Sequence, residues 1–182
     1  MGSLIEFLFE MGQLKNAPRS GWWTVRAPKE SVAEHTFRTA SVAHILAKMA
    51  KLSEKEELML IKAAIYHDLH EARITDLHMI AKKYVKADEK KCEEEQLQNL
   101  PKEIKEDIEG CLNLPPKLQI YLKDADKLEC ALQAKEYLDL GYKTKDWIEN
   151  TKKIVKSKEA KLLLKKLETE SSLKWLSKDR KD

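Results

Sequence analysis

The feature that most constrains this chain is an apolar run from Leu58 to Tyr66 that ends in the pair His67-Asp68. Only Lys62 interrupts the run. A segment that is apolar on nearly all sides is typical of a central, packed helix. An imidazole and a carboxylate at its end are costly to bury unless something binds them. We therefore expect a core helix whose end carries either a divalent cation or a simple hydrogen-bonded pair.

Helix signals recur along the rest of the chain, whereas the alternation typical of strands is scarce. Ser3, Ser31 and Ser53 are each followed three positions later by Glu, which is the capping-box pattern. Pro115-Pro116 suits the first turn of a long helix that ends before Gly141. The sequence therefore predicts an all-α fold, a bundle of helices.

The chain has 182 residues, enough for one well-filled core. We expect one domain over 1–182, with a core at about 4–140, C-terminal helices packed on that core and a polar tail at about 176–182. The segment 16–29 is expected to be a loop. The dense mixture of Lys and Glu in 82–109 is typical of a solvated helical excursion without chemistry.

Composition excludes several classes of protein. Lys and Arg number 34 against 31 Asp and Glu, and the interleaved charges form no basic stripe for nucleic acid. The three cysteines are widely spaced, which indicates neither a disulfide framework nor a cysteine zinc site. No apolar segment is long enough to span a bilayer, and the first residues lack the pattern of a signal peptide. We expect a cytoplasmic protein that binds neither nucleic acid nor membrane.

The polar residues on apolar helix faces are the candidates for chemistry. His35 falls near the middle of the apolar face of its helix, whereas His44 falls on the opposite side. Farther along the chain, Glu129 interrupts an apolar face, Asp126 lies at its edge and Asp124 points away. Asp126 is thus the better candidate ligand, with an ion pair to Lys123 as the alternative, and Glu129 is a candidate partner for a ligating histidine.

Together, His35, His67, Asp68 and Asp126 offer two imidazoles and two carboxylates. This donor set suits one divalent transition metal per chain, Mn, Co, Fe, Ni or Zn, and leaves positions for water and substrate. Glu71 follows within one helical turn and is the candidate general base.

Other nearby polar residues have open assignments. His70, three residues after His67, either joins a second metal or has a lining or hydrogen-bonding role, and the second interpretation is favoured. Asp76 is either a helix N-cap or a substrate contact.

The order and spacing of these residues resemble the H…HD…D signature of the HD-domain metal-dependent phosphohydrolases, which are entirely α-helical. The closer resemblance is to the 5′-deoxynucleotidase branch of that superfamily, and it spans roughly residues 4–140. The blocks that carry it are Leu14-Lys15, Arg19-Ser20-Gly21-Trp22, Glu30 to His35, His67 to Ala72, Asp76 and Asp126 to Glu129.

The resemblance implies a role for each matching residue. His35, His67, Asp68 and Asp126 would hold the metal, and Glu71 would position or deprotonate the attacking water. Arg19 would approach the phosphate, and Asp76 would meet a sugar hydroxyl. Trp22 would border the sugar, although Trp23 beside it is the alternative.

The function implied is hydrolysis of deoxyribonucleoside 5′-monophosphates to deoxynucleoside and phosphate, by a phosphoric monoester hydrolase that forms a homodimer. One alternative is an HD phosphohydrolase of another nucleotide, such as an alarmone, a cyclic nucleotide or a deoxynucleoside triphosphate. Another is a non-catalytic HD protein whose metal joins helices and whose surface binds a partner.

Overall fold

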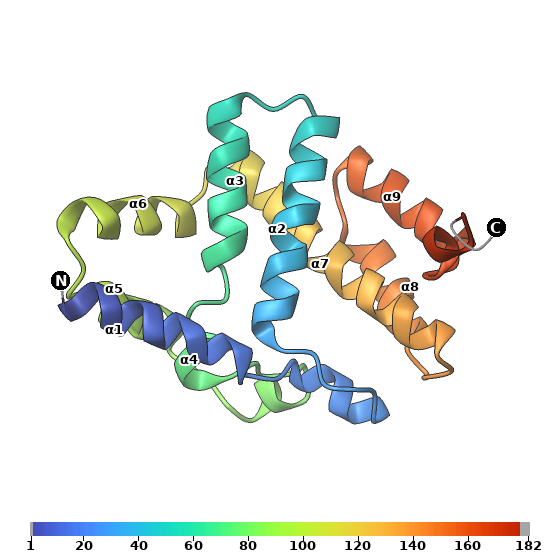
Figure 1. The fold of residues 1–182 in the computed structure, drawn as a ribbon, viewed down its shortest axis with the longest axis horizontal. Helices are drawn as coiled ribbons and strands as arrows, with labels where there is room; N and C mark the ends of the chain where they lie inside the picture. The colour runs from blue at the N-terminus through green and yellow to red at the C-terminus, as the bar shows by residue number, and fades with distance from the viewer. Residues whose placement is uncertain (1, 179–182) are drawn as a thin grey trace.

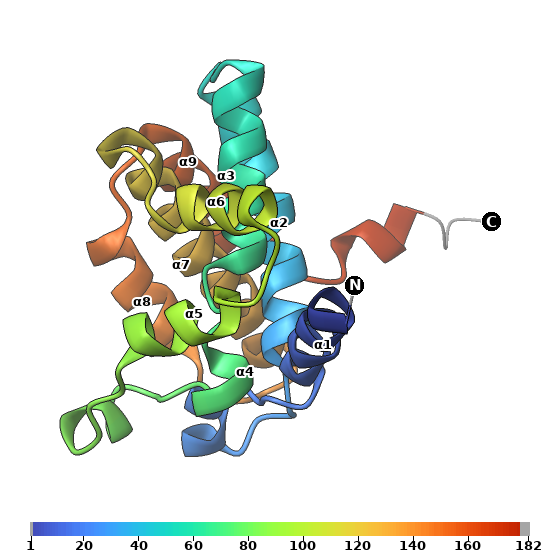
Figure 2. The same ribbon diagram turned by 90° about the vertical axis from the view of Figure 1, so that its left-hand side faces the viewer.

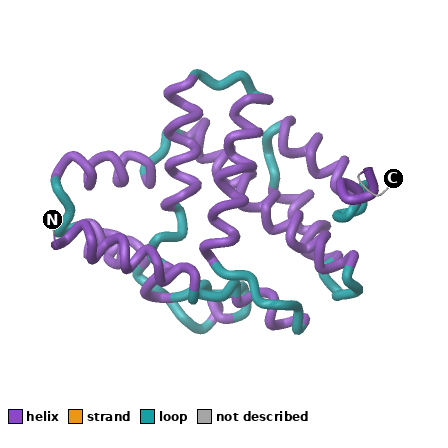
Figure 3. The backbone as a smooth tube through the Cα atoms, viewed as in Figure 1, coloured by secondary structure: helices purple, strands orange, loops and turns teal. Residues whose placement is uncertain are grey.

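Helices and the turns between them build all of the chain that the computed structural model describes, residues 2–178 (Figures 1 and 3). The α-helices are α1 (Gly2–Met11), α2 (Val32–Met49), α3 (Glu54–Tyr66), α4 (Glu71–Ile74), α5 (Glu89–Leu97), α6 (Lys102–Leu112), α7 (Pro116–Asp139), α8 (Lys145–Ile154) and α9 (Lys158–Thr169). The 3-10 helices are η1 (Gly12–Lys15), η2 (Ser20–Val25), η3 (Ala81–Lys83) and η4 (Lys174–Lys178). The predicted all-α fold is confirmed.

Three helices, α2, α3 and α7, form the centre of the bundle. In Figure 1, α2 and α3 stand side by side with α7 crossing behind them, and α8 and α9 lie along the outer side of α7. Fully buried side chains such as Leu46 of α2, Leu60 of α3 and Ala131 of α7 belong to one continuous core. The crossing of these helices brings residues distant in sequence to one place.

Local hydrogen bonds fix where α2 and α3 begin. The side chain of Ser31 accepts from the backbone of Glu34, and the Glu34 side chain accepts from the backbone of Ser31. Ser53 and Glu56 make the same pair of bonds at the start of α3. Both predicted capping boxes are confirmed. The box predicted at Ser3 is wrong, because α1 already includes Gly2 and Ser3 lies inside the helix.

The long helix α7 has the predicted ends. Pro116 is its first residue, where the missing N–H group costs no hydrogen bond. Gly141 follows the helix with a φ of +94°, a left-handed conformation that glycine adopts without strain. The register of α7, and with it the directions of its acidic residues, is thereby held at both ends.

A second, smaller cluster contradicts the expectation for 82–109. Leu97 and Ile108 pack with Phe7 of α1 and with Leu69. In Figure 2, α5 and α6 lie against the body of the molecule. Most of their Lys and Glu residues are exposed, but each helix also has a buried face that the dense charge pattern concealed.

Two further expectations differ from the structure in detail. The segment expected to be a loop, 16–29, contains the 3-10 helix η2 (Ser20–Val25). Most of the predicted polar tail, residues 179–182, lies outside the described residues. Within residues 2–178, every helix is too short or too polar to cross a membrane.

Candidate metal centre and active site

His35 lies in the interior, in the first turns of α2. The capping box at Ser31 starts the helix, and the imidazole of His35 is fully buried. Its Nε2 atom lies 3.5 Å from Oδ1 of Asp126 and 3.6 Å from Oδ2 of Asp68. Its Nδ1 atom bonds a carboxylate oxygen of Glu129. The ring is thus held from α7 on one side and presents its other nitrogen to two carboxylates.

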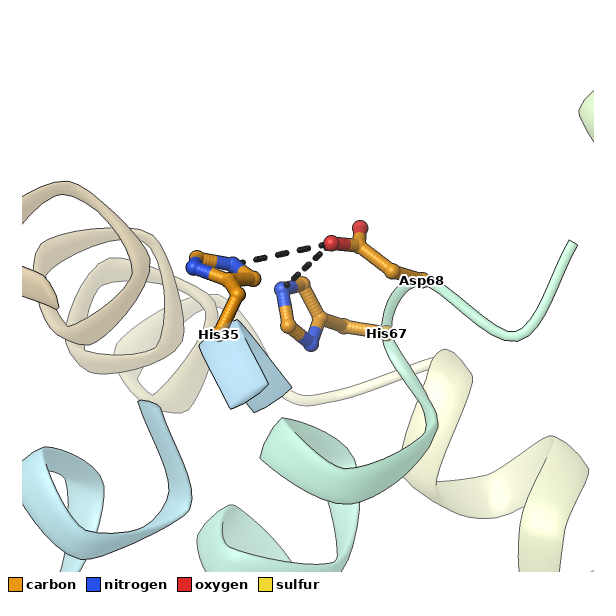
Figure 4. A group of neighbouring side chains, drawn as sticks. All are labelled: His35, His67 and Asp68. Atoms are coloured by element: carbon orange, nitrogen blue, oxygen red, sulfur yellow. Dashed lines mark ion pairs between the residues drawn. The ribbon is translucent and has the colours of Figure 1, made fainter. Parts of the chain in front are cut away.

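His67 and Asp68 follow the end of α3 directly. α3 ends at Tyr66, and His67 is its capping residue. The Nδ1–H group of His67 donates to the carbonyl oxygen of Ala64 at 2.9 Å, so its Nε2 atom carries a lone pair. That atom lies 3.2 Å from Oδ2 of Asp68. Figure 4 shows two imidazoles turned toward the same carboxylate, an arrangement that the helix end permits.

The donor set fits a divalent cation. Donor atoms of His35, His67 and Asp68 all lie within 4.8 Å of one another; we call these three residues the cation cluster. The Nε2 atom of His67 is buried without a hydrogen bond partner. A buried polar atom without a partner is costly, and a cation would satisfy it. Imidazole nitrogen and carboxylate oxygen are common ligands of divalent transition metals.

Asp126 lies at the edge of the cation cluster. Its Oδ1 atom faces His35, and its Oδ2 atom pairs with Nζ of Lys127 at 3.0 Å. It is not among the residues whose donor atoms all lie within 4.8 Å. The lysine that the sequence offered as its partner was Lys123, whereas the structure shows the following lysine, Lys127, in that place.

The surroundings of His35 and Asp126 favour the protonation states that bind a metal, a neutral imidazole and an ionised carboxylate. Burial, reinforced by the nearby charge of Arg19, lowers the pKa of His35 to about 3. The imidazole is therefore neutral at pH 7, which is the form that binds metals. Burial opposes ionisation of Asp126, but Lys127 and the two imidazoles hold the pKa of that carboxyl below its usual range.

Glu71 begins α4 next to the cluster. Its side chain is buried, and its Oε2 atom has no hydrogen bond partner. Donor atoms of Asp68, His70 and Glu71 lie within 4.8 Å of one another. Burial and the carboxylates of Asp68 and Asp76 raise the pKa of Glu71 to about 9. A divalent cation held beside Asp68 would offset this negative charge and favour an ionised Glu71 that can accept a proton.

Arg19 and Asp76 lie beside the cluster on two different loops. Nη1 of Arg19 lies 3.5 Å from Oδ2 of Asp68 and 3.9 Å from Oδ1 of Asp76. Oδ2 of Asp76 accepts the backbone N–H of Ser20 at 2.6 Å and its hydroxyl at 3.2 Å. The residues directly after Asp76 are not helical, so the N-cap alternative is wrong. Asp76 instead ties its loop to the loop of Arg19.

The two tryptophans have different surroundings. Trp22 is only 3% exposed, and its indole N–H donates to Oε2 of Glu30 at 2.6 Å. Its ring packs against Tyr137 and Trp147, with centroids 5.2 and 5.3 Å away. Trp23 is 54% exposed. The structure shows the Trp22 indole as part of the core. Contact of Trp22 with a sugar stays a prediction.

Three other polar residues are engaged elsewhere. Nδ1 of His44 lies 2.8 Å from Glu57 on the outer side of α2. Nδ1 of His70 lies 3.0 Å from Glu93 of α5. Both oxygens of Asp124 accept backbone N–H groups of the turn between α8 and α9, Lys156 at 2.9 Å and Ser157 at 2.7 Å.

Sequence reasoning predicted Glu129 as the partner of a ligating histidine but missed Arg38 behind it. Nε of Arg38 donates to Oε1 of Glu129 at 2.9 Å, and Glu30 lies beside the same guanidinium group. Arg38 comes three residues after His35, on a neighbouring part of the same helix face. That spacing was the available signal, but only the packing of α2 on α7 shows the partner.

Comparison with known proteins gives a consistent result. The model of the HD domain family matches residues 11–168. The 5′-deoxynucleotidase HDDC2 of Homo sapiens is 31% identical over 93% of this chain and 87% of its own. The crystal structure of genomics APC5600 is 38% identical and covers 93% of this chain and 95% of its own, with a TM-score of 0.79.

A more distant structure shares the fold. The HD phosphohydrolase DatZ of cyanophage S-2L, bound to dA and one catalytic Zn²⁺ ion, is 20% identical, with a TM-score of 0.60 over 88% of this chain and 94% of its own. At this identity the likeness concerns the arrangement of helices alone.

Proposed function

This chain belongs to the HD domain family and to its 5′-deoxynucleotidase-like branch, and we propose that it hydrolyses deoxyribonucleoside 5′-monophosphates. The products are a deoxynucleoside and inorganic phosphate. The observation that carries the proposal is the meeting of His35, His67 and Asp68 at one point, with the orphaned Nε2 atom of His67 among their donor atoms. Glu71 and Arg19 adjoin this point.

His35, His67, Asp68 and Asp126 would hold the divalent cation. A bound cation of this kind lowers the pKa of water from 15.7 to about 7 and withdraws charge from a phosphoryl oxygen. Asp126 adds a second carboxylate to the cluster, since its Oδ1 atom lies 3.5 Å from Nε2 of His35. The identity of the metal among Mn, Co, Fe, Ni and Zn is left to the experiment below.

Glu71 would act as the general base. Its unpartnered Oε2 atom takes a proton from the attacking water as that water's oxygen bonds to phosphorus. The bond between phosphorus and O5′ breaks on the opposite side, and O5′ leaves as the hydroxyl of the nucleoside after gaining a proton from solvent. Glu71 then releases its proton to solvent. One water is consumed for each phosphate released.

Arg19, Asp76 and Trp22 would bind the substrate. Burial disfavours the charge on Arg19, but the carboxylates of Asp68 and Asp76 raise its pKa, so the guanidinium stays charged. It would neutralise charge on the phosphoryl oxygens, where electrostatic stabilisation contributes most to phosphoryl transfer. Asp76 would meet a sugar hydroxyl, because its loop is tied by Ser20 to the loop that carries Arg19.

A phosphate-release panel tests this proposal. Deoxyribonucleoside 5′-monophosphates are compared with 3′-monophosphates, ribonucleoside 5′-monophosphates and di- and triphosphates, each with Mn²⁺, Co²⁺, Zn²⁺ or Mg²⁺. We expect the 5′-deoxy monophosphates to be hydrolysed fastest. Preference for a di- or triphosphate would replace the proposal with another HD phosphohydrolase activity.

The variant Glu71→Gln separates an enzyme from a metal-joined binding protein. Loss of the general base should lower turnover about 10²- to 10⁴-fold while the bound metal per chain stays the same. Equal activity of wild type and variant at equal metal content would contradict a catalytic role for Glu71.

A homodimer and a cytoplasmic location belong to the same proposal. Phe9 of α1 and Phe37 of α2 are 74% and 76% exposed, so a partner chain could bury either ring. The three cysteines are free, which suits a reducing compartment. Light scattering that gives the mass of one chain would refute the dimer, and fractionation of the source cells tests the location.

A further inference from the structure

Arg38 lies one layer behind the cation cluster, between α2 and α7. We propose that Arg38 is a positioning residue that acts through Glu129 and fixes the ring of His35 in the orientation that cation binding needs. The inference rests on the proposed cation site. It concerns a residue whose hydrogen bonds and ion pairs go to side chains behind the cluster, Glu30, Glu129, Gln133 and Glu136.

The guanidinium of Arg38 donates hydrogen bonds to three side chains along one face of α7. Its Nε atom donates to Oε1 of Glu129 at 2.9 Å and its Nη1 atom to Oε1 of Glu136 at 2.7 Å. Its Nη2 atom donates to the side-chain oxygen of Gln133. These partners are four and three residues apart, so they follow one another on neighbouring turns of α7. A planar, forked side chain meets such a row in one orientation, whereas lysine offers a single point charge.

Glu129 connects Arg38 to His35 by hydrogen bonds at its two carboxylate oxygens. One of its oxygens, Oε1, is occupied by Arg38, and the other, Oε2, bonds Nδ1 of His35. A carboxylate held at both oxygens cannot rotate without losing a bond. With Oε2 as the acceptor, the proton lies on Nδ1 of His35, and the lone pair of Nε2 faces Asp68 and Asp126. A ligating histidine is commonly oriented by a carboxylate in this manner.

The surroundings of Arg38 make it hard to replace. Oε1 of Glu30 lies 3.9 Å from its Nη2 atom, and Oε2 of Glu30 accepts the indole N–H of Trp22. Glu30 is 5% exposed and Glu129 is fully buried. Two buried carboxylates therefore flank one guanidinium group. Without that guanidinium the two carboxylates would lie near each other with no positive charge between them, which is unfavourable in an interior, and Glu129 would lose the bond at its Oε1 atom.

The affinity of the full-length, metal-free protein for Co²⁺ tests the inference, measured by calorimetry on wild type, Arg38→Met and Arg38→Lys. We expect Arg38→Met to bind Co²⁺ about 10- to 100-fold more weakly, the range typical when the partner of a ligating histidine is lost. Arg38→Lys keeps the charge without the fork and should lie between Arg38→Met and wild type.

The matched control is Glu136→Gln. It weakens an ion pair of the same guanidinium, but Glu136 is 44% exposed in its side chain and lies two turns from Glu129. We expect its Co²⁺ affinity to stay within about twofold of wild type. Nitrogen NMR of the metal-free protein gives a second readout: His35 should hold its proton on Nδ1 in wild type and in Glu136→Gln and should show mixed tautomers in Arg38→Met.

A fall of less than threefold in the Co²⁺ affinity of folded Arg38→Met would overturn the inference. If that variant does not fold, the same threshold applies to Arg38→Lys. Because the affinity is measured without substrate, an absence of nucleotide hydrolysis leaves this result standing. If the Arg38 variants bind Co²⁺ as tightly as wild type, the proposed hydrolysis is likewise unaffected.

Discussion

Two aspartates of α7, Asp124 and Asp126, lie two residues apart and should respond to mutation in opposite ways. Asp124 is 1% exposed, and its two oxygens accept N–H groups of Lys156 and Ser157 at 2.9 and 2.7 Å. Ser157 caps α9, so Asp124 fixes the turn that joins α8 and α9. Asp126 faces His35 instead.

The cost of Asp124→Ala follows from these two bonds. A hydrogen bond to a charged group contributes about 1.5 to 3 kcal/mol, so the pair contributes about 3 to 6 kcal/mol. Burial of the carboxylate offsets part of this gain. We expect a loss near the lower end, about 3 kcal/mol, which for a chain of this size lowers the melting temperature by about 6 to 12 °C.

Asp126→Asn should weaken Co²⁺ binding rather than lower stability. Its oxygens face the cation cluster and Lys127, so we expect weak Co²⁺ binding with a nearly unchanged free energy of unfolding in the metal-free protein. Thermal and urea denaturation, with Co²⁺ titration of each folded variant, measure both quantities. An Asp124→Ala variant within 0.5 kcal/mol of wild type, or one that loses Co²⁺ binding while folded, would refute this division of roles.

Three further outcomes are expected from single residues. Ser31→Ala removes the capping box of α2 and should cost about 1 kcal/mol in urea denaturation; Ser41→Ala, on the exposed side of α2, is its control. Tyr137→Phe loses the hydroxyl bond to the carbonyl oxygen of Pro28 at 3.0 Å and should also cost about 1 kcal/mol, and no change in the unfolding midpoint would show that this bond contributes nothing. Burial raises the pKa of Cys130 to about 12, so its thiol stays protonated at pH 8. The rate at which iodoacetamide alkylates Cys130 in the folded protein should therefore keep rising above pH 9. Rapid modification at pH 8, detected by mass spectrometry, would contradict this.

Local signals in the sequence predicted the parts of the fold that neighbouring residues decide. The capping boxes at Ser31 and Ser53, and the ends of α7 at Pro116 and Gly141, depend on contacts within a few residues. The pattern around Ser3 failed, because the same two residue types also occur inside a helix. A short pattern therefore predicts a helix start without excluding a helix interior.

Contacts between distant segments account for what the sequence did not predict. The charged segment 82–109 was expected to be solvated, yet Gln96 is buried and its amide donates to the carbonyl oxygen of Leu69 at 3.0 Å. Arg38 follows His35 by three residues, but its partner Glu129 comes from another helix. Such pairs become visible only when the crossing of the helices is known.

In the candidate site too, the sequence predicted what one helix decides and did not predict contacts between distant segments. The direction of His35 followed from the apolar face of α2, and the convergence of His67 with Asp68 was expected for the end of a helix. The loop contact between Ser20 and Asp76 joins residues 56 positions apart, and no periodicity indicates it. Helix faces thus predict which residues point inward, but not which loops close around them.

The location of a bound cation tests the central claim most directly. Crystals of the fully Co²⁺-loaded protein, measured on both sides of the cobalt absorption edge, locate the ion by its anomalous signal. The account predicts one strong peak per chain between His35, His67, Asp68 and Asp126. A peak elsewhere, or none among these residues in protein shown to carry one Co²⁺ per chain, would contradict it.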